Sequence, residues 1–303
     1  MLPIKGLFKK QAELILSSRN KALTYAILLA LLPYGTWLAM VVIALVTLRK
    51  GEREGGRVFL AAMVAHGLLL SASIPLYAAI INTLIVFVPS FLAAYTLRLT
   101  TSWQAVAAVL FLLVIVSAVI IQQMVPEWVM SQFTMLQSMI HASQSDQTLS
   151  KWLSQSSDIP VLVIANYALG IQFMTAVLSI WFALLMARSL QSRLYYPGGL
   201  TKELLSFRGN RLSCMVVGAL CFAAWQWNAV AMNVLPVLLW FYLLAGLSLC
   251  ANFIMSKSPR MILAVLILPL LLIPFVMLPL YVVLGLLDSV FNLRLAFATR
   301  RIL

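Results

Sequence analysis

Positively charged residues divide this chain into long apolar stretches that carry almost no charge. The chain is 63% hydrophobic and only 10% charged, which is more apolar than a soluble core requires. Lys151 is the one basic residue outside six short segments, which are 5–21, 49–57, 98, 188–211, 257–260 and 294–301. Cytoplasmic loops of membrane proteins carry such an excess of Lys and Arg. We therefore expect an all-α, polytopic transmembrane bundle in a bacterial inner membrane, surrounded by membrane lipids and with both termini cytoplasmic.

The formal net charge of +13 would suit nucleic-acid binding if the chain were soluble. Its basic residues, however, stand at the ends of apolar stretches and not along one helix face. This arrangement favours a membrane surface over nucleic acid, so we expect no nucleic-acid partner.

Six apolar stretches have the length of about 20 residues that a membrane-spanning helix needs. They are residues 57–74, 76–97, 104–124, 159–187, 212–230 and 234–255. Helices are the expected spanning form, because a barrel would show short segments of alternating polarity.

Two further apolar stretches, 22–48 and 261–290, are long for one span and short for two. Pro33 and Gly35 break the first, and three prolines break the second. A hairpin in each place would keep all the flanking basic residues on the cytoplasmic side, whereas a single crossing would separate them. We favour the hairpins and expect about 8–10 membrane segments in one domain covering residues 1–303; the single-crossing alternative stays open.

Three segments outside the spans have distinct expected roles. Residues 1–21 form a basic cytoplasmic N-terminus, either an amphipathic helix on the membrane or an irregular tail. Residues 125–158 form an external loop, and the apolar spacing at its start predicts an interfacial helix as an alternative to an ordered loop. Residues 188–211 form a cytoplasmic loop with a turn at Pro197–Gly199, followed by a short amphipathic helix.

Motifs of soluble catalysis and energy conversion are absent from the sequence. It has no HExxH, GxSxG or GxxxxGK[ST] pattern, and only two histidines. The three cysteines lie in or near apolar stretches without a CxxC pair, which argues against disulfides and zinc. We therefore expect no enzyme, no cofactor and no metal site.

Uncharged polar residues within the spans are the candidate ligand-binding residues. Each of them costs free energy in hydrocarbon unless it has a partner. The candidates are His66, Asn82, Asn166, Gln172, Trp225 and Asn228. Interhelical hydrogen bonding is the simpler explanation for any single one, but together with nearby aromatics they suggest a cavity for a small polar ligand.

Small residues repeat along the first apolar stretch. Ala22, Ala26 and Ala30 stand four residues apart and so line one helix face. Such a face permits close contact with another helix, which makes it a candidate surface for a membrane partner.

Three segments resemble the YybS-like family of bacterial membrane proteins, for which no function is assigned. They are LVTLRKGEREG at 45–55, LQSRLYYPGGLTKEL at 190–204 and GLLDSVFNLR at 285–294. Tyr196 and Asn292 depart from the family pattern of Asn and Asp. The family is remotely similar to the substrate-binding subunits of energy-coupling-factor transporters. That similarity implies a role in transport, with a coupling membrane subunit or an ATPase as partner. It also implies that a coupling membrane subunit contacts Ala22, Ala26 and Ala30.

Two functions follow from these observations. The first is small-molecule transport or substrate capture without an ATPase of its own, because polar residues lie mid-span and nucleotide-binding motifs are missing. The second is a membrane assembly or scaffold protein that binds another membrane or cytoplasmic protein through the alanine face and the basic loops.

Overall fold

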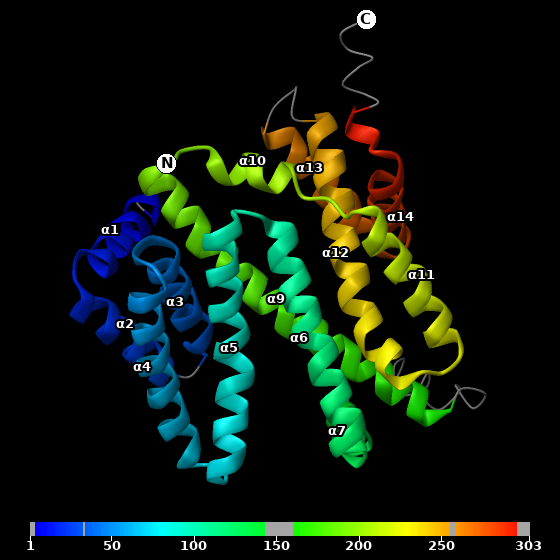
Figure 1. The fold of residues 1–303 in the computed structure, drawn as a ribbon, viewed down its shortest axis with the longest axis horizontal. Coiled ribbons are helices and arrows are strands. Elements are labelled where there is room, and N and C mark those ends of the chain that lie inside the picture. The colour runs from blue at the N-terminus through cyan, green and yellow to red at the C-terminus, as the bar shows by residue number, and fades with distance from the viewer. Residues whose placement is uncertain (1–3, 33, 143–159, 255–258, 296–303) are drawn as a thin grey trace, which may run out of the picture. The chain divides into compact units, whose positions relative to one another are not determined.

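The computed structural model describes residues 4–32, 34–142, 160–254 and 259–295. All regular secondary structure in these ranges is helical (Figure 1), which confirms the all-α class. Five of these helices are long and apolar enough to cross a membrane. They are α5 (Leu76–Thr100), α6 (Trp103–Met124), α9 (Val161–Tyr195), α12 (Ala229–Ile254) and α14 (Pro274–Phe291). The protein is therefore a multi-pass membrane protein.

The chain forms two compact units, and each is described by itself. Unit 1 consists of residues 1–110 and 176–207, and unit 2 of residues 111–175 and 208–303. Helices α6 and α9 contribute residues to both units.

Unit 1 begins with two helices joined by a sharp bend. α1 (Ile4–Ser17) and α2 (Arg19–Leu31) meet at 117°. Ser18 starts α2, because its hydroxyl accepts a 3.2 Å hydrogen bond from the Lys21 amide. The predicted N-terminal helix is therefore present from Ile4 onward; residues 1–3 lie outside the described range.

Residues 22–48 form the hairpin that the charge distribution predicts. α3 (Thr36–Lys50) packs on both α2 and α4 (Glu52–Ser71). Gly51, with a φ of +103°, reverses the chain between α3 and α4. Arg19 lies 3.7 Å from Glu54, so α2 and α4 start at the same end of unit 1.

The ends of α3, α5 and α9 lie at that same end. Arg98 of α5 donates 3.1 and 3.0 Å hydrogen bonds to the carbonyls of Thr47 and Leu48. Gln191 of α9 donates a 3.3 Å bond to the Leu48 carbonyl as well. We call this the basic end, because cations of α2, α3, α4, α5 and α9 gather there.

The alanine face of α2 is buried within unit 1. Ala22, Ala26 and Ala30 are at most 1% exposed, and α2 packs on α3 and α4. Their small side chains allow the close approach of these helices. A coupling subunit could reach the three alanines only if α2 left its neighbours, so the repeat is explained by packing inside the chain.

Unit 2 contains the helix that was predicted at the start of residues 125–158. α7 (Pro126–Ala142) places Val129 and Phe133 against Ala165 and Leu169 of α9. This apolar contact holds α7 on α9, as the helical spacing of its apolar residues predicts. Residues 143–159 of the expected external loop, with Lys151, lie outside the described residues.

The remaining helices of unit 2 pack around α12. α11 (Arg211–Trp225) and α14 both contact it. Gly246 of α12 and Gly285 of α14 leave no room for a side chain: an added Cβ would collide with the carbonyls of Tyr281 and Tyr242 respectively. The two helix backbones therefore meet closely at a pair of glycines.

Residues 261–290 form the second predicted hairpin. α13 (Pro259–Leu272) packs on α14, and the turn between them lies at Ile273. The Tyr281 hydroxyl donates a 3.1 Å hydrogen bond back to the Leu266 carbonyl. This bond links positions on opposite sides of the turn, as antiparallel neighbours require.

Three predicted boundaries are wrong. The segment 188–211 is not a loop throughout, because α9 continues to Tyr195 before Pro197 stops it. The span predicted at 212–230 ends at Trp225, since Trp227 adopts a left-handed φ of +63° and starts a turn. α12 then begins at Ala229, earlier than the predicted 234.

Candidate functional site

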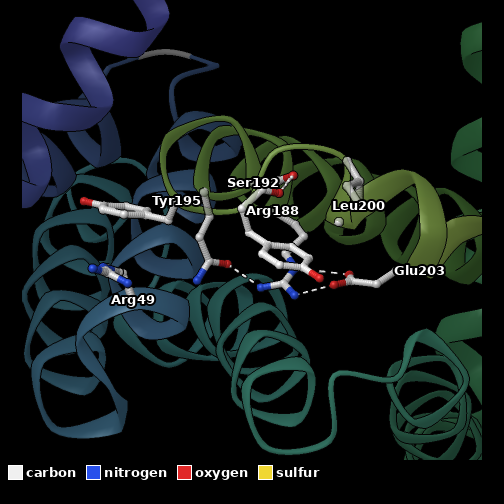
Figure 2. A pocket seen from close by; sticks show the side chains of 9 residues that line it. Arg49, Arg188, Ser192, Tyr195, Leu200 and Glu203 are labelled. Atoms are coloured by element: carbon white, nitrogen blue, oxygen red, sulfur yellow. Dashed lines mark hydrogen bonds and ion pairs between the residues drawn. The ribbon is translucent and has the colours of Figure 1, made fainter.

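A cavity of about 240 Å³ opens at the basic end of unit 1. Its walls come from the end of α3, the last turns of α9 and α10 (Gly199–Leu205). The lining residues are Arg49, Arg188, Gln191, Ser192, Tyr195, Tyr196, Gly199, Leu200 and Glu203 (Figure 2). We call this cavity the basic pocket, because its lining carries two guanidinium groups and one carboxylate.

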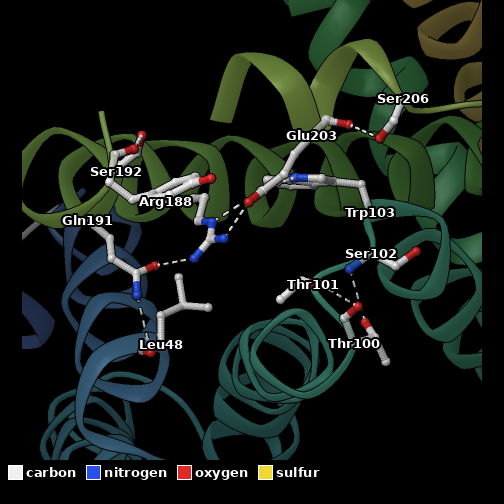
Figure 3. A network of polar contacts seen from close by, with 11 residues as sticks. Leu48, Thr100, Thr101, Ser102, Trp103, Arg188, Gln191, Ser192, Glu203 and Ser206 are labelled. Atoms are coloured by element: carbon white, nitrogen blue, oxygen red, sulfur yellow. Dashed lines mark hydrogen bonds and ion pairs between the residues drawn. The ribbon is translucent and has the colours of Figure 1, made fainter. Parts of the chain in front are cut away.

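Arg188 and Glu203 form the ion pair on one wall of the basic pocket (Figure 3). The Arg188 Nε donates a 3.1 Å bond to Glu203 Oε2, and its NH2 group bonds to Oε1. Both side chains are less than one-fifth exposed, at 18% and 17%. A two-point contact of this kind is among the stronger hydrogen-bonded pairs in proteins, because both partners are charged.

Neighbouring groups fix the orientation of this ion pair. Trp103 donates a 3.1 Å bond from its indole Nε1 to Glu203 Oε2. The Arg188 NH1 group donates a 2.6 Å bond to Gln191 Oε1, and Gln191 in turn bonds the Leu48 carbonyl. The pair is therefore connected to α3, α6 and α9 at once.

Arg49 lies on the opposite side of the basic pocket, over the ring of Tyr195 (Figure 2). The distance from its guanidinium carbon to the ring centroid is 3.7 Å, a cation–π contact. Within the described residues, no carboxylate forms an ion pair with Arg49. The N–H groups at the edge of this guanidinium are thus available to a ligand.

An aromatic cluster supports α10 and with it Glu203. The ring centroids of Trp103 and Trp181 are 5.0 Å apart, and those of Trp181 and Phe207 are 5.6 Å apart. All three rings are at most 6% exposed. The Gln104 amide adds a 3.2 Å bond to the Ser206 carbonyl. These contacts hold the end of α10 on α6 and α9.

The Pro-Gly-Gly turn brings α10 back over α9, as the sequence predicts. Gly198 adopts a φ of +85°, which favours glycine. Gly199 is buried under the Tyr196 ring, where an added Cβ would collide with the ring carbons. Ser192 closes the turn with a 2.9 Å bond from its hydroxyl to the Tyr196 carbonyl.

His66 and Asn82, two of the predicted ligand residues, face different surroundings in unit 1. The His66 Nδ1 lies 3.2 Å from the Thr83 hydroxyl, and its ring meets the edge of Phe87 at 5.4 Å. Asn82, which precedes Thr83 on α5, is exposed. His66 therefore joins α4 to α5, and neither residue lines the basic pocket.

Asn166 belongs to a cluster of three amides inside unit 2. Its Oδ1 accepts a 2.7 Å bond from Gln122 and a 3.2 Å bond from Asn233, while its own amide donates to the Leu162 carbonyl at 2.8 Å. Asn166 and Asn233 are 1% and 0% exposed. This cluster joins α6, α9 and α12 by interhelical hydrogen bonds, the simpler of the two expected explanations.

The other three predicted residues of unit 2 lie at exposed positions. Gln172 and Trp225 are exposed. Asn228 stands before α12, where its Oδ1 accepts a 3.0 Å bond from the Ala231 amide, as a helix N-cap does. The Asn228 side chain therefore caps the start of α12.

Asp288 forms an ion pair with Arg294 at the end of α14. The Arg294 Nε donates a 2.9 Å bond to Asp288 Oδ2, and the carboxylate is fully buried. Burial lowers the pKa of the Arg294 guanidinium from its usual value, while the charge of Asp288 acts in the opposite direction. This pair anchors the residues after α14 to the end of unit 2.

Sequence reasoning missed the residues of the basic pocket. By sequence alone, Arg49 and Arg188 counted only as part of the cytoplasmic charge excess, whereas both line the basic pocket. The signal that could have distinguished them is Glu203, an acidic residue within the basic segment 188–211. Comparison with protein-family models, curated proteins and solved structures finds no match to this chain.

Proposed function

We propose that this protein binds a small anionic molecule at the cytoplasmic face of a bacterial inner membrane. Its role would be small-molecule transport or substrate capture. The observation that carries the proposal is the basic pocket, which Arg49 and Arg188 both line and in which Arg49 has no carboxylate of its own. The YybS-like resemblance and its remote link to transporter subunits agree with this role.

The charge of the basic pocket supports an anionic ligand. Two guanidinium groups face one carboxylate, so the lining carries one excess positive charge at neutral pH. Partly enclosed walls strengthen the attraction between this charge and an anion, because the local dielectric constant is below that of water. A neutral or cationic ligand would leave Arg49 unneutralised.

The location of the basic pocket supports capture from the cytoplasm. The pocket lies at the end of unit 1 where Arg19, Arg49, Arg98 and Arg188 gather. The excess of Lys and Arg marks cytoplasmic segments. Active transport would draw its energy from an ion gradient or a separate ATPase, since the chain lacks a phosphate-binding loop motif.

A thermal unfolding assay on the detergent-purified protein tests the proposal. Acetate, citrate, sulfate and inorganic phosphate would be added separately at ionic strength matched with sodium chloride, with acetamide as the uncharged control. An anion at about 100 times its dissociation constant stabilises the protein by about 2.7 kcal/mol. We expect at least one anion to raise the unfolding temperature, and acetamide not to raise it.

Two variants locate the effect. Arg49→Gln removes a guanidinium whose described contact is the Tyr195 ring, so the variant should fold and lose the stabilisation. Lys202→Gln removes the same charge from the exposed surface of α10 and should retain it. Stabilisation that is equal in both variants, or absent from the wild type, would refute the proposal.

A further inference from the structure

Building on the proposed function, we infer that the anionic group held in the basic pocket is a phosphate group, and that Glu203 occupies its place on Arg188 when the pocket is empty. The inference names the ligand chemistry of the same site. Its argument comes from the number and arrangement of hydrogen-bond donors in the pocket.

The two guanidiniums offer more donors than the protein uses. Arg188 has five N–H groups, of which three bond to Glu203 and Gln191. Arg49 brings five more, and its one described contact is through its face to the Tyr195 ring. Since the arginines come from α3 and α9, their donors approach the pocket from different walls.

A tetrahedral phosphate suits donors that converge from several directions. Its acceptor oxygens, at least three in number, point in different directions around the phosphorus atom. A carboxylate has only two oxygens, and both lie in the plane of the group. Arginine binds phosphate through two parallel N–H bonds, the same contact that Arg188 makes with Glu203. A phosphate bound to Arg188 and Arg49 together would therefore replace a contact that the protein already forms.

Charge indicates how Glu203 takes part. A phosphate monoester carries a charge of about −1.5 to −2 at pH 7. Arg49 and Arg188 match this charge only when Glu203 no longer neutralises Arg188. Glu203 is thus an internal competitor, and removing its charge should strengthen phosphate binding while removing either arginine charge should weaken it.

The phosphate could belong to a soluble compound or to the headgroup of a membrane lipid. The basic end suits both sources, because anionic lipids also lie at the cytoplasmic surface. The two sources share the chemistry of the pocket and differ in whether vesicle composition changes the binding of a soluble probe.

Equilibrium binding of radiolabelled inorganic phosphate to the full-length protein in phosphatidylcholine nanodiscs tests the inference. Phenyl phosphate, citrate and acetate serve as competitors. We expect phenyl phosphate to compete and the carboxylates to compete at least about tenfold more weakly. Arg49→Gln should weaken phosphate binding about tenfold or more, and Glu203→Gln should strengthen it, since each change alters one charged hydrogen-bonding group.

Each outcome has a separate meaning. Stabilisation by citrate or acetate through Arg49, with no phosphate binding, would overturn the phosphate inference and leave the proposed function standing. Binding of no anion would overturn both. Phosphate binding that Glu203→Gln weakens while the variant keeps the wild-type unfolding temperature would overturn the competitor role.

Nanodiscs that contain phosphatidylglycerol distinguish the sources. If the lipid headgroup occupies the basic pocket, the apparent affinity for phenyl phosphate falls in these nanodiscs for the wild type. The charge-matched variant Lys202→Gln should show the same fall. An affinity that does not depend on the lipid identifies a soluble phosphate compound.

Discussion

Replacing Asn166 by leucine should destabilise unit 2, because the residue connects two other amides. Leucine has nearly the same shape but accepts no hydrogen bond. The change removes the 2.7 Å bond from Gln122 and the 3.2 Å bond from Asn233. The Oδ1 of Asn233 already has no described partner, so this fully buried amide would lose its last side-chain hydrogen bond.

The magnitude follows from these two losses. Interhelical hydrogen bonds in membrane proteins average about 0.6 kcal/mol, with a maximum near 1.7. A buried polar group left without a partner adds about 1–3 kcal/mol. We expect Asn166→Leu to lower the free energy of unfolding by about 2–3 kcal/mol, measured by tryptophan fluorescence during denaturant unfolding in detergent micelles.

A double-mutant cycle checks the reasoning. Asn166→Leu combined with Asn233→Leu removes both partners, so no buried donor is stranded and the pair should cost about 1–2 kcal/mol less than the sum of the singles. Gln172→Leu is the control, because this amide on the same helix is exposed and should change stability by less than about 0.5 kcal/mol. Additive effects of the two Asn changes would show that the amides do not depend on each other.

Three further changes test other contacts, each by thermal unfolding. Gly246→Ala should cost about 1–3 kcal/mol, because its Cβ would meet the Tyr281 carbonyl across the α12–α14 contact; an unchanged unfolding temperature would contradict this packing. Gly218→Ala, on α11 where a Cβ meets nothing within 4 Å, should instead stabilise by up to about 1 kcal/mol, and a loss of stability would contradict the open surroundings. Trp103→Phe should cost about 1–2 kcal/mol through the lost bond to Glu203, and a neutral effect would mean that the indole N–H does not support the ion pair.

Charge and chain breaks predicted much of the fold. The basic N-terminus and the run from Arg49 to Arg57 indicated that residues 22–48 turn back on themselves, and the contacts of α2 with α3 and α4 confirm it. This succeeded because the side of the membrane on which a Lys or Arg lies constrains topology directly. The turn at Gly198 was equally readable, since a positive φ favours glycine.

Which polar side chains of a span face a neighbouring helix could not be predicted in the same way. Asn166 and Gln172 lie on different faces of α9, and the sequence does not state which face meets another helix. The structure buries Asn166 and exposes Gln172. Likewise, the sequence marks the basic pocket only through Glu203 within the basic segment 188–211. The pocket itself exists only after α3, α9 and α10 have packed together.

The number of helices that are long and apolar enough to cross a membrane is smaller than the number of membrane segments predicted, because several helices are shorter than a span. α2 has 13 residues and α3 has 15, which correspond to about 20 and 22 Å at 1.5 Å per residue. The hydrocarbon core is about 30 Å thick. Five described helices pass the test for a span, or six if the bent pair of α1 and α2 counts as one, against the 8–10 segments expected. The helices that fall short are α4 and α11, each predicted as a full span, and the hairpin helices α2, α3 and α13, whereas α14 of the second hairpin passes the test.

Side-specific labelling of the basic pocket tests the central claim most directly. Tyr196, a lining residue that is 65% exposed, would be changed to cysteine in a chain whose native cysteines are replaced by alanine. A membrane-impermeant maleimide should label this cysteine in inverted membrane vesicles, and an anion that stabilises the protein should slow the reaction. Labelling in right-side-out vesicles but not in inverted ones would place the pocket outside the cell and contradict capture from the cytoplasm.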